Sequence, residues 1–142
     1  MIPLTLTFQG GAKYDYGAQS DARISVPLEI EGVQTTAIVD TGAPYLICSP
    51  DIAERIVFSD GLGSVRLNTH AGILTGQRYR GRAKLVPEKG EGTEFEATIF
   101  VPENEEWRGK PSFLGFHCCL ERIRFAVDPS KEMFYFADAG AD

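Results

Sequence analysis

One carboxylate stands where it could take part in acid–base chemistry. Asp40 directly follows the apolar residues 37–39 and precedes Thr41, Gly42 and Ala43. A buried charge is costly unless a partner compensates it. The Thr41 hydroxyl can supply a hydrogen bond, and Gly42 permits a close backbone approach or a positive φ. The pattern indicates a carboxylate held rigidly at a strand end, where another backbone comes close.

Asp-Thr-Gly alone is not specific, because the same residue types also close ordinary turns. A structural role for Asp40, as the turn residue of a hairpin, therefore stays open at this point. The strands and helices predicted around Asp40 are needed to choose between a turn role and a catalytic role.

The elements around Asp40 are predicted to be mostly short strands. Alternating apolar and polar residues predict a hairpin of strands 24–30 and 33–39, turning at Glu31-Gly32. Gly10-Gly11 is expected to end the first strand, and Ser49 and Pro50 to begin a short helix. Further strands are expected at residues 3–8, 45–48, 65–67, 76–86, 95–101, 123–127 and 133–136, and short helices at 51–56 and 116–122. So few helices predict a mostly β fold.

Two segments resemble the aspartic protease family. Residues 37–43 are similar to its active-site loop, in which two apolar residues precede Asp-Thr/Ser-Gly-Ala/Ser. Phe113-Leu114-Gly115 is similar to the apolar-apolar-glycine segment that packs behind that loop. The order hairpin, Asp loop, flap hairpin, glycine segment, helix and strand also matches over residues 24–136. The resemblance is to the single-lobe, retropepsin-like proteases of retroviruses and, more specifically, of bacteria.

The resemblance implies an all-β fold, a closed and mostly antiparallel β-barrel of the acid protease type with one or two short helices. Residues 1–142 would form one single-lobe domain, with strand 3–8 and tail 137–142 at its periphery. Pro44 departs from the retroviral pattern, where a polar residue usually follows the loop. Phe116 and His117 stand where family members often carry Asp or Arg.

The same resemblance implies the site residues. Asp40 would be catalytic, with Thr41 locking two loops across a dimer and Gly42 placing its backbone near the carboxylates. A flap tip at residues 68–75 would close over an extended polypeptide. Its substrate-binding residues would be Ala71, Gly72 and Ile73, and the possible pocket lining is Ile47, Ile73 and Leu74.

The motif occurs once in this sequence, whereas the family's chemistry needs two carboxylates. A two-lobed enzyme would need a second motif and a longer chain. The resemblance therefore implies a homodimer that brings Asp40 against Asp40 of the partner subunit. Two carboxylates about 3 Å apart share a proton, so one can activate water while the other protonates the peptide carbonyl. We expect an aspartic endopeptidase; the alternative is a catalytically silent dimerisation or protein-binding module of the same fold.

Cysteine and histidine could support other chemistry. His117, Cys118 and Cys119 are contiguous, with His70 and Cys48 elsewhere. Structural zinc sites usually separate paired cysteines by a few residues, and adjacent cysteines lack that spacing. No sequence typical of a catalytic nucleophile surrounds any cysteine. We expect no metal site and no cofactor.

Charge and hydropathy limit the partners. The formal net charge is −6, which disfavours nucleic-acid binding, and the alternating Arg78, Arg80, Arg82 and Lys84 are typical of a solvated strand face. No apolar run approaches the ~20 residues of a membrane span, and the sequence begins without the features of a signal peptide. With an odd number of cysteines, these features predict a cytoplasmic protein with reduced thiols and no membrane partner.

Overall fold

Six strands close into a barrel in the computed structural model, which describes residues 8–14, 24–69 and 72–139. The strands are β1 (Gly10–Lys13), β2 (Ser25–Ile30), β3 (Val33–Val39), β4 (Leu46–Ile47), β5 (Gly61–Thr69), β6 (Gly72–Leu85), β7 (Lys89–Gly90), β8 (Thr93–Pro102), β9 (Ser112–Leu114), β10 (Ile123–Asp128) and β11 (Met133–Asp138). The helical segments are α1 (Pro50–Ala53) and the short 3₁₀ helices η1 (Glu105–Trp107) and η2 (Leu120–Arg122). The expected all-β fold, a closed barrel with few short helices, is confirmed.

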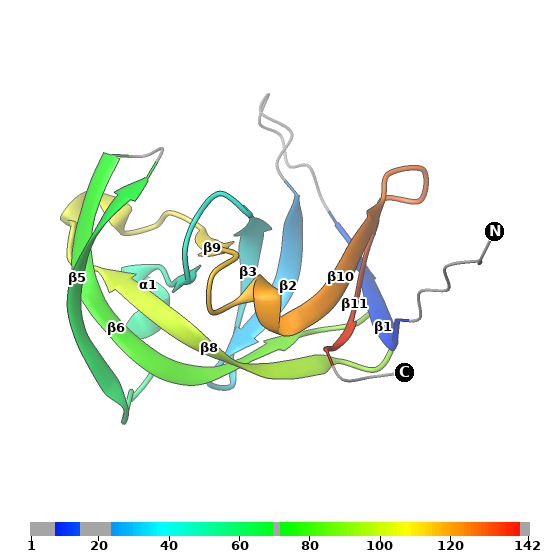
Figure 1. Cartoon of the computed structure of the whole chain (residues 1–142), viewed down its shortest axis with the longest axis horizontal. Coiled ribbons are helices and arrows are strands. Elements are labelled where there is room, and N and C mark those ends of the chain that lie inside the picture. Colours follow the sequence, from blue (N-terminus) through cyan, green and yellow to red (C-terminus); the bar gives the residue numbers. More distant parts are fainter. Residues whose placement is uncertain (1–7, 15–23, 70–71, 140–142) are drawn as a thin grey trace.

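The barrel closes because β2 pairs with β3 on one side and with β6 on the other. Its strand order is β2-β3-β9-β4-β8-β6, with β5 paired to the outer edge of β6. The β3–β9 and β4–β8 pairs are parallel and the others antiparallel. A second sheet, β10-β11-β1-β7, lies at the opposite end of the molecule from the β5–β6 hairpin (Figure 1).

The glycines at positions 10 and 11 do not break a strand, as the sequence had suggested, but form β1 between β11 and β7. A Cβ added at Gly10 would lie 1.9 Å from the Glu91 carbonyl oxygen. Glycine is needed here because it lets two backbones come close, which is a tertiary requirement that local propensity does not reveal. The expected strand 3–8 falls, apart from Phe8, outside the described residues, and Phe8 is not in a strand.

Three other boundaries differ from expectation. The first helix begins at Pro50 after Ser49, as expected, but it ends at Ala53, and the Ser49 side chain makes no capping hydrogen bond. Residues 116–122 form turns followed by η2, because Cys118 has a φ of +55° that no helix accommodates. The predicted peripheral tail begins too early, since β11 continues to Asp138 and Ala137 is buried in the core.

The core has two clusters of buried side chains. The larger one fills the barrel and extends to the second sheet; its bulkiest members include Leu28, Ile30, Leu46, Leu85, Ile99, Leu114, Phe134 and Phe136. The smaller one joins β4, β5, β6 and β8 to the segments around residues 43 and 107; it contains Ala43, Ile47, Leu67, Leu74, Phe100 and Trp107. Ala43 therefore anchors the residues that follow Asp40 in packed apolar surroundings.

Asp51 connects α1 to the loop that follows η1. Its Oδ1 accepts hydrogen bonds from the Gly109 N–H at 3.0 Å and the Ser49 hydroxyl at 2.7 Å. The bond from Gly109, followed by the one from Ser49, lowers the pKa of Asp51 below its ordinary value. Both bonds favour the ionised carboxylate.

Replacing Asp51 with alanine is expected to lower the free energy of unfolding by about 1 kcal/mol at neutral pH, since water screens this exposed group. Because the folded-state pKa is lowered, the stabilisation is present above the unfolded value of 3.8 and is lost as pH falls through the folded value. Thermal unfolding should show a Tm about 2–4 °C lower at neutral pH. Glu106→Gln, in η1 just before that loop, is the control. A Tm difference that persists undiminished in strong acid would contradict this role.

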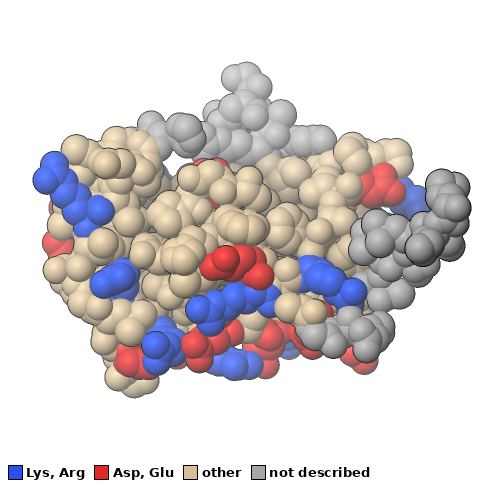
Figure 2. All heavy atoms as spheres, in the orientation of Figure 1, with Lys and Arg blue, Asp and Glu red and all other residues tan. Residues whose placement is uncertain are grey.

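The basic residues of β6 face acidic residues of β8 and the loop before β5. Arg80 contacts Asp60 at 3.1 Å and Glu96 at 3.3 Å, and Arg82 contacts Glu94 at 3.5 Å. Figure 2 shows both signs of charge interspersed along the lower part of the face drawn. The expected solvated strand face is confirmed at these residues. Within the described residues, no helix has the length and apolar character needed to cross a membrane.

Candidate active site

Asp40 lies at the end of β3, in a loop whose backbone is bonded to its neighbours. The Asp40 N–H donates to the Leu114 carbonyl of β9 at 2.9 Å, and the Ala43 N–H donates to the Asp40 carbonyl at 3.1 Å. The Gly42 N–H donates to Asp40 Oδ1 at 3.0 Å. Asp40 is partly buried, while Thr41 and Gly42 are exposed. The loop therefore fixes one carboxylate oxygen and presents its next two residues to the surface.

β9 holds this loop by lying between β3 and β4. After β9, the Gly115 N–H donates to the Tyr45 carbonyl at 2.9 Å, and the Phe116 N–H donates to the Ala43 carbonyl at 2.8 Å. A Cβ on Gly115 would lie 2.2 Å from the Tyr45 oxygen and 2.5 Å from the Ala43 oxygen. Only glycine fits between these carbonyls, so Gly115 positions the Asp loop.

Tyr45 is a positioning residue that the sequence analysis missed. It has a φ of +64°, directly after Pro44, and its N–H donates to the His117 carbonyl at 2.9 Å. Positive φ is uncommon for a bulky residue and persists where surrounding contacts hold it. No local sequence signal marks it, since glycine and asparagine are the usual indicators of such a conformation.

The β5–β6 hairpin packs against the Asp loop close to the hairpin tip. Leu67 and Leu74 form a cross-strand pair and belong to the same buried cluster as Ala43. Towards the tip, Gly72 has a φ of +106°, and its carbonyl accepts a bond from the Thr69 hydroxyl at 2.8 Å. The structure thus joins the expected flap hairpin to the Asp40 loop through a shared apolar cluster.

The structure agrees with some, but not all, of the positions expected for the flap and for apolar pockets. Ile73 is 51% exposed and is free to contact another molecule. Ala71 lies outside the described residues. Ile47 and Leu74 are buried in the core, so the expectation that they line a pocket is wrong for both. The sequence shows that these side chains are apolar but does not tell a core position from a pocket.

Similarity to known proteins was found in the fold. Neither a protein-family model nor a curated protein matches the chain. A crystal structure of a retropepsin-like aspartic protease from Rickettsia conorii superposes with a TM-score of 0.56 at 20% sequence identity, covering 90% of each chain. The chain has a retropepsin-like fold. At this identity the likeness establishes the architecture, while the chemistry must be argued from the residues.

Two of the three thiols are unsuited to reaction within this retropepsin-like fold. Cys48 and Cys119 are buried, and burial is the main reason why the pKa of each thiol rises to about 12. A thiol needs its thiolate form to act as a nucleophile. Cys118 is partly exposed, with its Sγ 3.4 Å from His117 Nε2.

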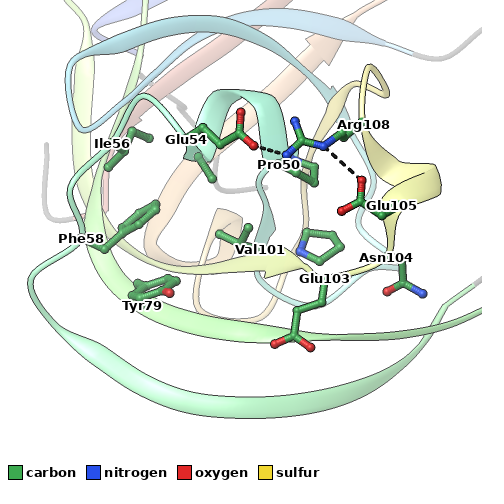
Figure 3. Close-up of a pocket in the computed structure, with 12 residues that line it drawn as sticks. Pro50, Glu54, Ile56, Phe58, Tyr79, Val101, Glu103, Asn104, Glu105 and Arg108 are labelled. Carbon is green, nitrogen blue, oxygen red and sulfur yellow. Dashed lines mark hydrogen bonds and ion pairs between the residues drawn. The ribbon is translucent and has the colours of Figure 1, made fainter.

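The retropepsin-like barrel also carries a cavity of about 480 Å³ on its α1 side (Figure 3). Phe58 and Tyr79 stack there at 4.3 Å between ring centroids, and Arg108 bonds Glu54 and Glu105. Val101 of β8 lines this cavity, whereas the preceding Phe100 packs in the cluster that contains Ala43. Successive strand residues point to opposite faces, so this cavity and the Asp40 loop lie on different sides of β8.

Proposed function

We propose that this chain is an aspartic endopeptidase that hydrolyses peptide bonds of extended polypeptides as a homodimer. The observation that carries the proposal is the Asp40 loop. Its carboxylate stands at a strand end with Oδ1 held by the Gly42 N–H, and Gly115 locks the loop from behind. The retropepsin-like fold supports a hydrolase of this type.

The homodimer follows from the chemistry, because one chain supplies one Asp-Thr-Gly sequence and two carboxylates are required. A two-fold axis at the loop would bring Asp40 beside Asp40 of the partner subunit. The exposure of Thr41 and Gly42 supports an interface there, as does Phe116, which is 43% exposed and bonded to Ala43. In this dimer the Thr41 hydroxyl bonds across the axis.

The proposed reaction uses the two carboxylates in opposite protonation states. The ionised Asp40 removes a proton from a water molecule as its oxygen attacks the scissile carbonyl carbon. The protonated Asp40 of the partner subunit donates its proton to the carbonyl oxygen, which gives a tetrahedral diol. Proton transfer to the amide nitrogen then breaks the carbon–nitrogen bond and releases an amine and a carboxylic acid. No covalent enzyme intermediate, metal or cofactor takes part.

The hairpin tip supplies substrate contacts in this proposal. Ala71, Gly72 and Ile73 would pair with an extended peptide by backbone hydrogen bonds, as in the addition of a strand to a sheet edge. Closure of such a lid excludes water from the carboxylates. The proposed location is the cytoplasm, where free thiols stay reduced.

A peptide-pool assay tests the proposal. The wild-type chain is expected to release new amino termini from apolar peptides in assays between about pH 4 and pH 7, because the reaction needs one ionised and one protonated carboxylate. A peptide with a hydroxyl group in place of the scissile carbonyl should bind tightly and shift the chain to dimers in sedimentation, because it mimics the tetrahedral state. A chain that is monomeric and silent throughout this range would instead be a retropepsin-like binding module.

A further inference from the structure

Three side chains that can bind a metal ion lie close together, two in the turn after β9 and one in η2. The ligand atoms of His117, Cys118 and Glu121 lie within 4.8 Å of one another. His117 Nε2 is 3.4 Å from Cys118 Sγ, and His117 Nδ1 is 3.1 Å from Glu121 Oε1. His117 and Glu121 are exposed and Cys118 is partly buried. These two short contacts involve different nitrogens of the ring, and one ion can bind only one of them. The common separation of at most 4.8 Å still places an imidazole, a thiol and a carboxylate within reach of one ion.

The barrel holds the backbone beneath these side chains. The Tyr45 N–H donates to the His117 carbonyl, and the Thr98 N–H of β8 donates to the Cys118 carbonyl, both at 2.9 Å. The Cys118 N–H donates to Glu121 Oε1 at 2.6 Å. Cys118 adopts a φ of +55°, a strained backbone conformation for a residue with a Cβ. This fixed backbone brings the three side chains together before any ion arrives.

We propose that His117, Cys118 and Glu121 bind one divalent transition-metal ion per chain, with Zn²⁺ as the best fit. Thiolate, imidazole and carboxylate are the ligands of zinc, and three of them leave a fourth position for water. In a tetrahedral zinc site, a thiolate sulfur and an imidazole nitrogen lie about 3.5 Å apart. The Cys118–His117 distance of 3.4 Å is close to this value. On binding, Cys118 loses its thiol proton to solvent.

This proposal replaces the sequence expectation of no metal site. That expectation weighed Cys118 together with Cys119, but Cys119 is buried and cannot reach the ion. The third ligand is instead Glu121, three residues after Cys118, which a search for cysteine pairs does not find. Calcium and magnesium are disfavoured, because they prefer sites made of oxygen ligands.

The site is joined to the Asp loop without including it. The carbonyl of His117 accepts the Tyr45 N–H, and the adjacent Phe116 N–H donates to Ala43. A bound ion would hold residues 117–121 in the conformation that supports these bonds. Metal binding itself does not depend on the proposed protease activity, so Asp40→Asn is expected to bind metal as the wild type does.

Cobalt(II) titration of the reduced chain of 142 residues tests the proposal. We expect an intense thiolate-to-cobalt charge-transfer band at one ion per chain, which added Zn²⁺ abolishes. Cys118→Ser should remove the band while leaving the buried Cys48 and Cys119. His117→Gln and Glu121→Gln should weaken cobalt binding by about tenfold or more. Glu106→Gln, which changes an exposed acid in η1, is the matched control and should bind as the wild type does.

Several outcomes would overturn the site. These are a folded wild type without the band, a band that persists in Cys118→Ser, one ion per two chains, or unchanged affinity in Glu121→Gln. Circular dichroism confirms that each variant is folded. If Cys118→Ser does not fold, Glu121→Gln decides, because Glu121 is an exposed side chain.

Discussion

Asp40→Asn should lower peptide hydrolysis by about 10³-fold or more, because asparagine can neither take a proton from water nor share one with a second carboxylate. Asparagine retains the side-chain oxygen that accepts the Gly42 N–H. The loop should therefore keep its shape, and the loss should appear in kcat with little change in Tm. Steady-state kinetics and thermal unfolding measure the two effects separately.

Asp60→Asn is the matched control for this variant. Asp60 is a half-exposed carboxylate bonded to Arg80, on the loop before β5. It should retain wild-type kcat, since nothing in the proposed reaction uses it. Near-normal hydrolysis by Asp40→Asn, with Asp60→Asn equally active, would mean that Asp40 is only a turn residue.

Gly115→Ala is expected to have the second largest effect, on both stability and activity. The added Cβ would lie 2.2 Å and 2.5 Å from two carbonyl oxygens of the Asp loop, so backbone must move. Overpacking of this kind, with the loss of nearby hydrogen bonds, should cost about 3 kcal/mol. Thermal unfolding should show a Tm lower by roughly 6–12 °C. Any folded protein should be about 10²-fold less active, because the loop is displaced.

Gly61→Ala is the control for glycine replacement. A Cβ at Gly61 meets nothing within 4 Å, and Gly61 also lies in a strand. It should change Tm by no more than about 2–4 °C, given the small effect of surface substitutions. Equal Tm values for the two variants would show that Gly115 does not lock the Asp loop.

The local sequence pattern was sufficient to predict segments whose structure depends mainly on their own residues. The alternation over residues 24–39 predicted the β2–β3 hairpin, and the observed pairing places Ile30 opposite Val33. Phe113-Leu114-Gly115 was expected behind the Asp loop, and β9 lies there. These segments carry the periodicity or residue type that their positions require.

The local sequence pattern gave wrong predictions where contacts between residues distant in the sequence determine the structure. The sequence suggested that Gly10 ends a strand, yet Gly10 lies within β1. It is glycine because the Glu91 carbonyl comes too close for any side chain. Tyr45 adopts a positive φ while its N–H bonds His117, far along the chain. Cys118 does so while its N–H bonds the Glu121 side chain, three residues on. The burial of Leu74 depends on packing between the hairpin and the Asp loop. None of these causes is present in a short window of sequence.

The central claim is that two copies of Asp40 act together, and mixing wild-type and Asp40→Asn subunits tests it most directly. The two proteins are unfolded together in equal amounts, refolded so that subunits reassort, and assayed at fixed total concentration. If activity needs both carboxylates, only about one quarter of the dimers remain competent, by random pairing around a two-fold axis. The account predicts activity near one quarter of that of the wild type. Activity near one half would mean that each chain works alone, and would contradict the account.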